Sequence, residues 1–296
     1  MRALVVPLQD APSPERLRGR IDARLSELLP RPADHRDLVC MAMREAALAA
    51  GKRTRPLMVL IAGRELGGDP AALLDLGCAV EMVHAASLVL DDMPCMDNAA
   101  LRRGRPTIHR RFGEDIAALA SVGLLSQAFA TVAALPSVAP AARARMVGVL
   151  ATAIGPQGLV RGQCLDLRDS GARAADDIAD TNHLKTGALF AAALEMAALL
   201  ADADDATRRA LGRVALELGQ AFQLQDDLRD RHDSASTGKD SHQDAGKSTL
   251  LALLGADEVE RRLHAHLRRA RDTLADIYGE DSALEAYCSR LFGASQ

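Results

Sequence analysis

The stretch EMVHAASLVLDDMPCMD, residues 81–97, joins an apolar helical segment to a cluster of aspartates. This stretch predicts a helix whose own apolar residues point to more than one side. A helix that is apolar on all sides must be buried. Pro94 cannot continue the helical hydrogen bonds, so the helix should end or kink there. The chain can then return Asp97 to the side of Asp91, at the end of a buried helix.

A second acidic cluster ends another apolar helix, in QLQDDLRD at residues 223–230. Asp226 and Asp230 are four residues apart and therefore share one helix face. Carboxylates beside a core are costly without a cation, and oxygen-only ligands favour Mg²⁺ or Mn²⁺. Solvated helix ends are an equally good interpretation of either cluster alone. We interpret Cys95, inside the first cluster, as a small space-filling residue.

Composition points to a helical, globular protein. The 296 residues suit one large domain, 48% of them are apolar and 26% are charged, and Ala and Leu favour helix. A net charge of −4, with 5 Phe, 2 Tyr and no Trp, is unlike a nucleic-acid or membrane binder. We therefore expect an all-α single domain over 1–296, with residues 1–14 flexible.

Helical periodicity continues along the chain and is interrupted where Pro and Gly gather. No strand and no internal repeat is predicted. The expected helices span about residues 15–29, 35–50, 54–67, 70–92, 105–114, 116–134, 139–168, 176–199, 204–231, 247–254, 257–278 and 281–291.

The cysteines and the apolar runs indicate the cellular compartment of the protein. Five cysteines without a CxxC pair indicate reduced thiols and a cytoplasmic protein. The first residues lack the apolar core of a signal peptide. The longest apolar run, Ala188–Leu200, contains Glu195 and is too short to span a bilayer. We expect no stable membrane insertion.

Basic motifs accompany the two acidic clusters. They are GKRTRP at 51–56, LRRGRP at 101–106, KTG at 185–187, GKD at 238–240 and GKS at 246–248. So many cations beside carboxylates in an acidic chain indicate a site for polyanionic ligands, held by metal and side chains together. The chain has no P-loop motif, so ordinary nucleotide phosphoryl transfer is a poor fit.

These motifs, in this order, resemble the trans-isoprenyl diphosphate synthases, most closely the bacterial geranylgeranyl diphosphate synthases of carotenoid pathways. The strings that carry the resemblance, from about residue 50 to 255, are GKRTRP, EMVHAASLVLDDMPCMDNAALRRGRPTIH, GLVRGQCLDL, HLKTGALF, FQLQDDLRD and TGKDSHQDAGKSTL. The resemblance implies the isoprenoid synthase fold, a bundle of long antiparallel helices around a central cavity, with both clusters facing each other at its mouth. It also implies a homodimer formed through helices around 105–134.

The implied reaction adds isopentenyl diphosphate to dimethylallyl, geranyl or farnesyl diphosphate by ionisation, condensation and proton loss. Three Mg²⁺ ions per active site, or Mn²⁺, would be held by Asp91, Asp92, Asp97, Asp226 and Asp230, with Asp227 as a ligand or a close neighbour. The allylic diphosphate would contact Arg102, Lys185 and Lys239. Isopentenyl diphosphate would contact Lys52, Arg55, His84 and Arg103. Dipoles of Lys185, Thr186 and Gln223 would face the carbocation, while Gln163 and Asp166 would line the cavity.

Other interpretations of these residues stay open at this point. Without the resemblance, His84 on an apolar helix is more readily a core histidine, and Arg102 with Arg103 form a solvated turn. Arg229, where the family often has an apolar residue, could pair with Asp226 or Asp230.

Residues before the first cluster set the expected product length. Ala86 stands five residues before Asp91, roughly 7.5 Å along a helix, and Ser87 follows it. Both are small, whereas the family has a bulky aromatic near here when the product has fifteen carbons. The resemblance therefore implies a twenty-carbon product, geranylgeranyl diphosphate, with Met82 or Phe129 as the floor of the tunnel.

Three other functions compete with this one. They are a farnesyl or longer-chain synthase, a class I terpene cyclase, and a non-catalytic subunit of a prenyl synthase. A cyclase pairs one aspartate motif with a site of the NSE type, and a non-catalytic subunit should have lost its aspartates. This chain keeps two Asp-rich motifs.

Overall fold

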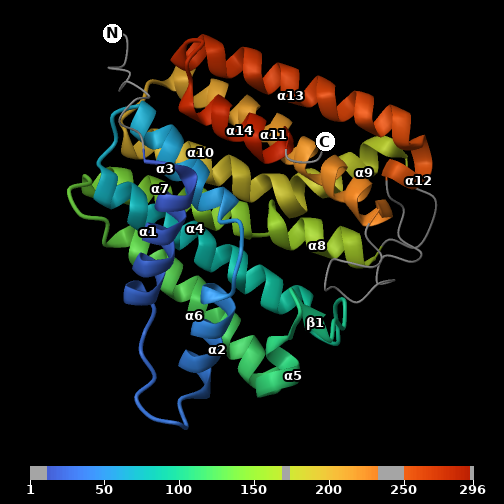
Figure 1. Ribbon diagram of the computed structural model, residues 1–296. Helices are drawn as coiled ribbons and strands as arrows, with labels where there is room; N and C mark the ends of the chain where they lie inside the picture. The colour runs from blue at the N-terminus through green and yellow to red at the C-terminus, as the bar shows by residue number, and fades with distance from the viewer. Residues whose placement is uncertain (1–11, 169–173, 233–249, 294–296) are drawn as a thin grey trace.

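Helix α4 (Pro70–Asp91) runs through the middle of the computed structural model of this chain, with other helices on both sides of it (Figure 1). The structure describes residues 12–168, 174–232 and 250–293, with the backbone alone at 230–232. It is 77% helical with almost no sheet, so the all-α prediction is confirmed. The single domain over 1–296 stays a prediction, and residues 1–11 of the expected flexible segment lie outside the described residues.

The elements follow one another as α1 (Pro14–Leu28), α2 (Leu38–Leu48), α3 (Thr54–Glu65), α4 (Pro70–Asp91), β1 (Leu101–Arg102), β2 (Arg105–Pro106), α5 (Ile108–Phe112), α6 (Glu114–Ala133), α7 (Pro140–Ile154), α8 (Leu159–Leu167), α9 (Ala175–Asn182), η2 (His183–Gly187, a π-helical turn), α10 (Ala188–Leu200), α11 (Asp205–His232), α12 (Leu250–Leu254), α13 (Ala256–Tyr278) and α14 (Ala283–Gly293).

Two apolar helices form the centre of the core. α4 packs against α3, α6 and α10, and α10 packs in turn against α3 and α11. α11 and α13 lie together along one side of the bundle, with α2 and α6 on the other (Figure 1). Met82 and Ala86 of α4 and Phe190 of α10 are almost entirely buried. The central position of α4 follows from its apolar residues, which leave it no solvent face.

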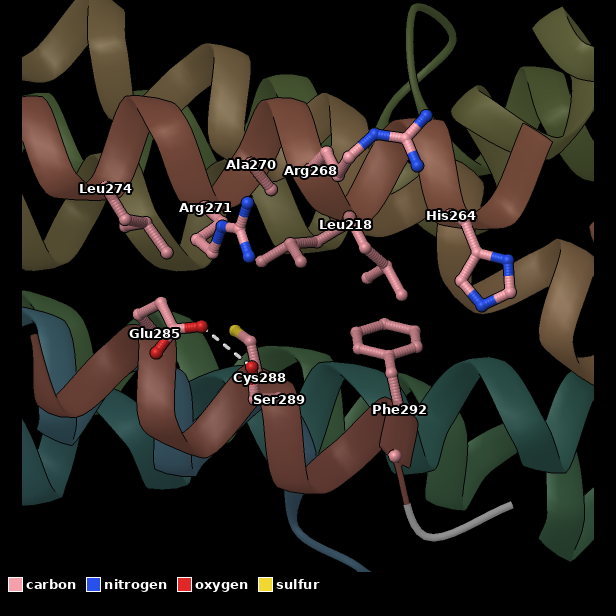
Figure 2. A pocket seen from close by; sticks show the side chains of 12 residues that line it. Leu218, His264, Arg268, Ala270, Arg271, Leu274, Glu285, Cys288, Ser289 and Phe292 are labelled. Atoms are coloured by element: carbon pink, nitrogen blue, oxygen red, sulfur yellow. Dashed lines mark hydrogen bonds between the residues drawn. The ribbon is translucent and has the colours of Figure 1, made fainter. Parts of the chain in front are cut away.

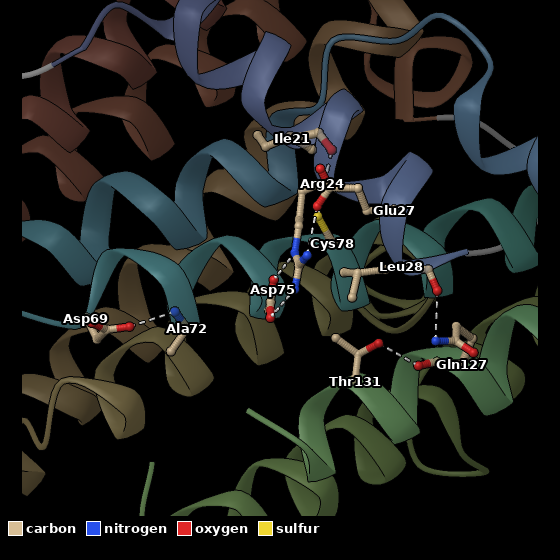
Figure 3. A network of polar contacts seen from close by, with 10 residues as sticks. All are labelled: Ile21, Arg24, Glu27, Leu28, Asp69, Ala72, Asp75, Cys78, Gln127 and Thr131. Carbon is tan, nitrogen blue, oxygen red and sulfur yellow. Dashed lines mark hydrogen bonds and ion pairs between the residues drawn. The ribbon is translucent and has the colours of Figure 1, made fainter. Parts of the chain in front are cut away.

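Polar contacts fix where α4 begins and how its neighbours attach. The Asp69 carboxylate accepts a hydrogen bond from the backbone N–H of Ala72 at 2.8 Å, and Pro70 occupies the first turn, as helix starts favour. Arg24 of α1 donates to both carboxylate oxygens of Asp75 in α4, at 2.6 and 3.0 Å (Figure 3). This pair sets α1 against the outer side of α4.

The expected helix over 105–114 is partly wrong. Residues 101–106 form a two-stranded hairpin, with Leu101 paired to Pro106 and Arg102 to Arg105. Its two turn residues, Arg103 and Gly104, have φ of 53° and 74°. Two consecutive positive φ angles are typical of the tight turns that join antiparallel strands.

Two further helices differ from the expected ones. The expected helix over 139–168 divides into α7 and α8 because Gly155 and Pro156 end the first of them, and Pro lacks the N–H that a helix needs. The expected helix over 176–199 contains the π-helical turn η2 at His183–Gly187. Such turns are rare, and they are frequent at functional sites.

By length and composition alone, three helical stretches among the described residues could cross a membrane: Pro70–Asp91, Glu114–Ala133 and Ala175–Leu200. The last of these stretches is longer than the apolar run Ala188–Leu200 in the sequence, because the helical segment begins at Ala175. The fold buries 72% of the apolar window in α4 but only 39% of that in α6. Leu119 and Val122 of α6 are 53% and 65% exposed, so α6 has an apolar face that the described part of this chain does not cover.

Candidate active site

The first aspartate cluster lies at the end of α4. The backbone N–H of Asp97 donates to the carbonyl of Asp91 at 2.9 Å, so the chain returns Asp97 beside Asp91, and that expectation is confirmed. Burial raises the pKa of Asp91 to about 6. The Lys185 ammonium opposes the rise, and the Asp97 carboxylate adds to it. A desolvated carboxylate beside a second carboxylate attracts a cation.

Asp92 is paired with the hairpin. Its buried carboxylate accepts from Nε of Arg102 at 2.8 Å and lies 2.7 Å from Nη2 of the same guanidinium. Burial raises the pKa of Asp92 in spite of this partner. Asp92 and Arg102 therefore form an ion pair in the structure. That Asp92 binds metal and that Arg102 binds diphosphate stay predictions.

The loop before α3 is anchored by a residue that the sequence analysis did not single out. Arg53 is buried, and its guanidinium lies 2.7 Å from the Glu81 carboxylate and 2.8 Å from that of Asp22. Arg103 of the hairpin reaches the same loop, where its Nη1 donates to the Ala50 carbonyl at 2.6 Å. These contacts hold the loop that carries Lys52, and Arg103 connects this loop to the hairpin.

Arg55 is a buried cation with few partners. It is 9% exposed, and its Nε has no hydrogen-bond partner among the described residues. Its Nη1 lies 3.5 Å from Nδ1 of His84, and the guanidinium carbon lies 4.6 Å above the Phe190 ring. Burial lowers the pKa of Arg55 to about 10. Burial and the nearby arginines hold the pKa of His84 well below its ordinary value, so the neutral imidazole offers the guanidinium no negative charge.

The second aspartate cluster lies near these bases. Asp226 favours the charged forms of both Lys52 and Arg55, although burial lowers the pKa of each base. One turn earlier on α11, Nε2 of Gln223 donates to Oδ1 of Asp227 at 2.9 Å. The structure thus places Asp226 within electrostatic range of the residues expected to hold isopentenyl diphosphate.

The π-helical turn η2 carries the KTG motif. The Lys185 ammonium donates to Oδ2 of Asp166 in α8 at 2.7 Å, and Thr186 follows it, partly buried. Gln163, also in α8, is 8% exposed, and neither its amide oxygen nor its amide nitrogen has a partner among the described residues. Since Lys185 also acts on Asp91, this turn faces the first aspartate cluster.

The residues expected to set product length lie along α4. Ala86 and Met82 are fully buried, and the Ser87 hydroxyl donates to the His84 carbonyl at 2.9 Å. Phe129 of α6 is partly buried and packs against the core. Lys239 and the side chain of Asp230 lie outside the described residues.

The donor set fits a hard divalent cation. The available ligands are carboxylates, and Asp91 is desolvated beside Asp97, a combination that suits Mg²⁺. Within the described ranges, no three His, Cys, Asp or Glu side chains lie close enough to form a ready-made metal site. Ligand oxygens or water would therefore have to complete the coordination.

A groove of about 270 Å³ lies elsewhere, between α13 and α14 (Figure 2). Leu218, Leu274 and Phe292 supply apolar side chains, and Arg268 and Arg271 stand along α13 (Figure 2). None of the residues lining this groove belongs to the predicted site.

Two parts of the site were missed from the sequence. The π-helical turn had one signal, Gly187 within an expected helix, directly before its apolar run. The pairing of Asp92 with Arg102 had none, because it depends on the hairpin that returns the chain toward α4.

Known proteins share both the sequence and the fold. The family model of polyprenyl synthetase matches residues 37–287. A geranylgeranyl diphosphate synthase of Pantoea ananas is 54% identical over 88% of this chain and 86% of its own. A geranylgeranyl diphosphate synthase of Pseudescherichia vulneris is 50% identical over 94% of this chain and 91% of its own.

The crystal structure of an FPP/GFPP synthase from Zymomonas mobilis superposes with a TM-score of 0.85 at 35% identity, over 94% of this chain and 97% of that one. The expected isoprenoid synthase fold is confirmed by this likeness. Both the sequence and the fold of this chain are therefore similar to those of these proteins over most of their length. This chain belongs to the polyprenyl synthetase family.

Proposed function

We propose that this chain is a geranylgeranyl diphosphate synthase, which adds isopentenyl diphosphate to allylic diphosphates until the product has twenty carbons. The observation that carries the proposal is the buried Arg55 guanidinium, which lacks a partner at Nε and lies against neutral His84 and within range of Asp226. A desolvated cation of this kind is suited to an anionic ligand. The two relatives above are named for this product.

In the proposed reaction, the C–O bond of the allylic diphosphate breaks, and the diphosphate leaves with the bonding pair. The terminal alkene carbon of isopentenyl diphosphate then bonds to the allylic cation. Loss of a proton from the resulting cation forms the new double bond. No side chain acts as a nucleophile, so the protein must stabilise charge and exclude water.

The chain's residues divide this work. Arg55, His84, Lys52 and Arg103 hold isopentenyl diphosphate. Lys185, Arg102 and Lys239 hold the allylic diphosphate. To do so, Arg102 gives up or shares its contact with Asp92. The side-chain oxygens of Thr186 and Gln223 and the Lys185 carbonyl face the cation. The family is generally magnesium-dependent, and bound Mg²⁺, three ions per site by our proposal, supplies the positive charge that offsets the departing diphosphate. Asp91, Asp97, Asp226 and Asp230 hold it, with Asp92 and Asp227 beside them.

The twenty-carbon product rests on α4. Ala86 is fully buried beneath the aspartates and has no bulk to stop a growing chain, and Met82 lies one turn deeper. We place the floor of the tunnel at Met82 or Phe129.

We further propose a cytoplasmic homodimer. The exposed apolar face of α6, with Leu119 and Val122, is suited to pairing with the same face of a second copy. The five cysteines are all free, as in proteins of a reducing compartment.

The test is incubation of the purified protein with labelled isopentenyl diphosphate and with dimethylallyl, geranyl or farnesyl diphosphate in Mg²⁺, followed by chromatography of the product. We expect geranylgeranyl diphosphate, no product after chelation, and a loss of at least about 100-fold in kcat for Asp91→Asn and Asp226→Asn. Asp272→Asn, an exposed carboxylate on α13, is the matched control. A cyclised hydrocarbon, or no product without a second protein, would overturn the proposal.

A further inference from the structure

The π-helical turn η2 is held between two neighbouring helices by close backbone contacts. It spans His183–Gly187 and joins α9 to α10, and both α8 and α11 pack against it. A π-helical turn is less favourable than the α-helix on either side of it. Something in the surroundings must therefore keep it in place.

On the α8 side the contact is at Gly162. A Cβ atom at this position would lie 2.3 Å from the backbone nitrogen of Lys185, and 2.8 Å from the carbonyl carbon of Leu184 and from the Cα of Lys185. All three are backbone atoms, so no side-chain rotation could make room. Only glycine permits α8 to lie this close to the turn.

On the α11 side the contact is at Gly219. A Cβ atom there would lie 2.9 Å from the Cα of Gly187, again a backbone atom. Gly187 is itself confined, because a Cβ on it would lie 2.8 Å from Nδ1 of His183. The turn is thus in backbone contact with both helices.

The α8 contact also sets the partner of Lys185. Asp166 lies four residues after Gly162 on α8, on the same face, and its Oδ2 accepts from the Lys185 ammonium at 2.7 Å. The separation between α8 and η2 therefore fixes both where the Lys185 backbone lies and how its ammonium is aimed.

We propose that Gly162 and Gly219 are positioning residues, which hold the π-helical turn between α8 and α11 so that Lys185 and Thr186 point into the active site. The role of these two residues in the active site rests on the proposed function. We call Gly162 and Gly219 together the clamp, and their close packing on the turn follows from the backbone contacts on each side of it.

The test compares Gly162→Ala and Gly219→Ala with Gly212→Ala. Gly212 is on α11 two turns before Gly219, and a Cβ there meets nothing within 4 Å, so the control carries the same gain in helix propensity. We expect kcat to fall about 100-fold in the two clamp variants, since displacement of about 1 Å can cost that much. In the control, kcat should stay within about twofold of wild type.

Two binding measurements separate positioning from general damage. By calorimetry with Mg²⁺, inorganic diphosphate should bind about tenfold more weakly to the clamp variants and to Lys185→Ala, but normally to the control. Isopentenyl diphosphate should bind all of them within about twofold of wild type, because its proposed residues lie on α3, the loop before it, α4 and the hairpin rather than on η2. Thermal unfolding of each variant shows whether it remains folded at the assay temperature.

The possible results lead to different conclusions. If Gly162→Ala and Gly219→Ala match Gly212→Ala in kcat and diphosphate affinity, the clamp is wrong. If they lose affinity for both ligands in parallel with a lower Tm, the glycines are only structural and the proposal is again wrong. If wild type makes no condensation product, the proposed function fails, and the diphosphate affinities still decide whether the clamp holds Lys185.

Discussion

At the scale of single residues, the site keeps charged groups that the fold only partly compensates. Asp91 and Arg55 are the clearest cases: burial raises the pKa of the carboxyl to about 6 and lowers that of the guanidinium to about 10. Each charge makes the empty site less stable than apolar residues would. A substrate or metal ion of opposite charge recovers that cost when it binds.

We expect Asp91→Asn to stabilise the metal-free protein at pH 7 while it removes activity. The pKa is about 6 in the fold against an ordinary 3.8, so between these values the folded chain binds more protons than the unfolded one. The free energy of unfolding therefore falls as pH rises through this interval. The Asn variant does not titrate, so at pH 7 it avoids a loss of about 1–3 kcal/mol in the free energy of unfolding. Urea unfolding in chelator at pH 7 should show the difference, and at pH 3.8 or below it should nearly vanish. A less stable Asn variant at pH 7 would contradict this explanation.

Arg55→Met should weaken isopentenyl diphosphate binding selectively. Methionine keeps most of the apolar stem but removes the guanidinium, so the charge and its contact with the Phe190 ring are lost together. A hydrogen-bonded charge is worth about 1.5–3 kcal/mol, so the KM for isopentenyl diphosphate should rise about 10–100-fold. Steady-state kinetics should show the KM for the allylic substrate within about twofold of wild type. Arg213→Met, exposed on α11, serves as the control, and an equal rise in both KM values would contradict the assignment.

At the scale of elements, α4 carries both the aspartates of the proposed metal site and the residues of the proposed product tunnel. Ala86→Tyr would place a ring about 7.5 Å from Asp91 along this helix. We expect the main product to shorten from twenty to fifteen carbons, as measured by chromatography, with the aspartates undisturbed. Ala79→Ser, also buried on α4 but two turns deeper, adds little volume and should leave product length unchanged. A twenty-carbon main product from the tyrosine variant would refute the depth interpretation.

The last helix is held by a buried carboxylate. Glu65, at the end of α3, accepts hydrogen bonds from the backbone N–H groups of Ala283 and Leu284 at 2.7 and 3.0 Å, where α14 begins. We expect Glu65→Ala to reduce the free energy of unfolding by about 1–3 kcal/mol, because the buried donors lose their acceptor. Chemical unfolding should show this, with exposed Glu280→Ala as the control. An unchanged midpoint would mean that α14 does not depend on this cap.

The elements also show how far sequence patterns reach. Apolar runs ended by Asp, Pro or Gly locate α4 and α11 well, because those residues act within a single turn. The hairpin at 101–106 was missed because its short strands carry no alternating pattern. The break between α7 and α8 was missed although Gly155 and Pro156 mark it. The π-helical turn depends on contacts with α8 and α11, which are distant in sequence.

The site was easier to foresee than its internal pairing. Which residue types gather could be read from the motifs, because the motif strings carry the charges. The sequence does not indicate which charged side chains pair with one another. Arg102 pairs with Asp92, and Lys185 pairs with Asp166, only through the tertiary fold. The anchor role of Arg53, between Lys52 and Arg55, likewise depends on Glu81, which lies on another helix.

At the scale of the whole molecule, the exposed face of α6 has to be explained. Leu119 and Val122 are 53% and 65% exposed on a helix otherwise apolar enough to be buried. We expect Val122→Glu to shift the protein from dimer to monomer in analytical ultracentrifugation, because a charge cannot be buried there without a partner. Leu216→Glu, 41% exposed on α11, is the matched control and should stay dimeric. A wild-type monomer would remove this explanation of the face.

The unbroken course of α4 from Pro70 to Asp91 has an evolutionary consequence. One helical turn advances by about 5.4 Å, on the order of the length of a single five-carbon unit in an extended prenyl chain. Successive inward-facing positions of this helix are therefore spaced like the increments of the prenyl chain that we propose grows beside them. Descendants of such a protein could change which lipid they make by exchanging one amino acid at a chosen turn, while the ionising machinery at the helix end is inherited intact.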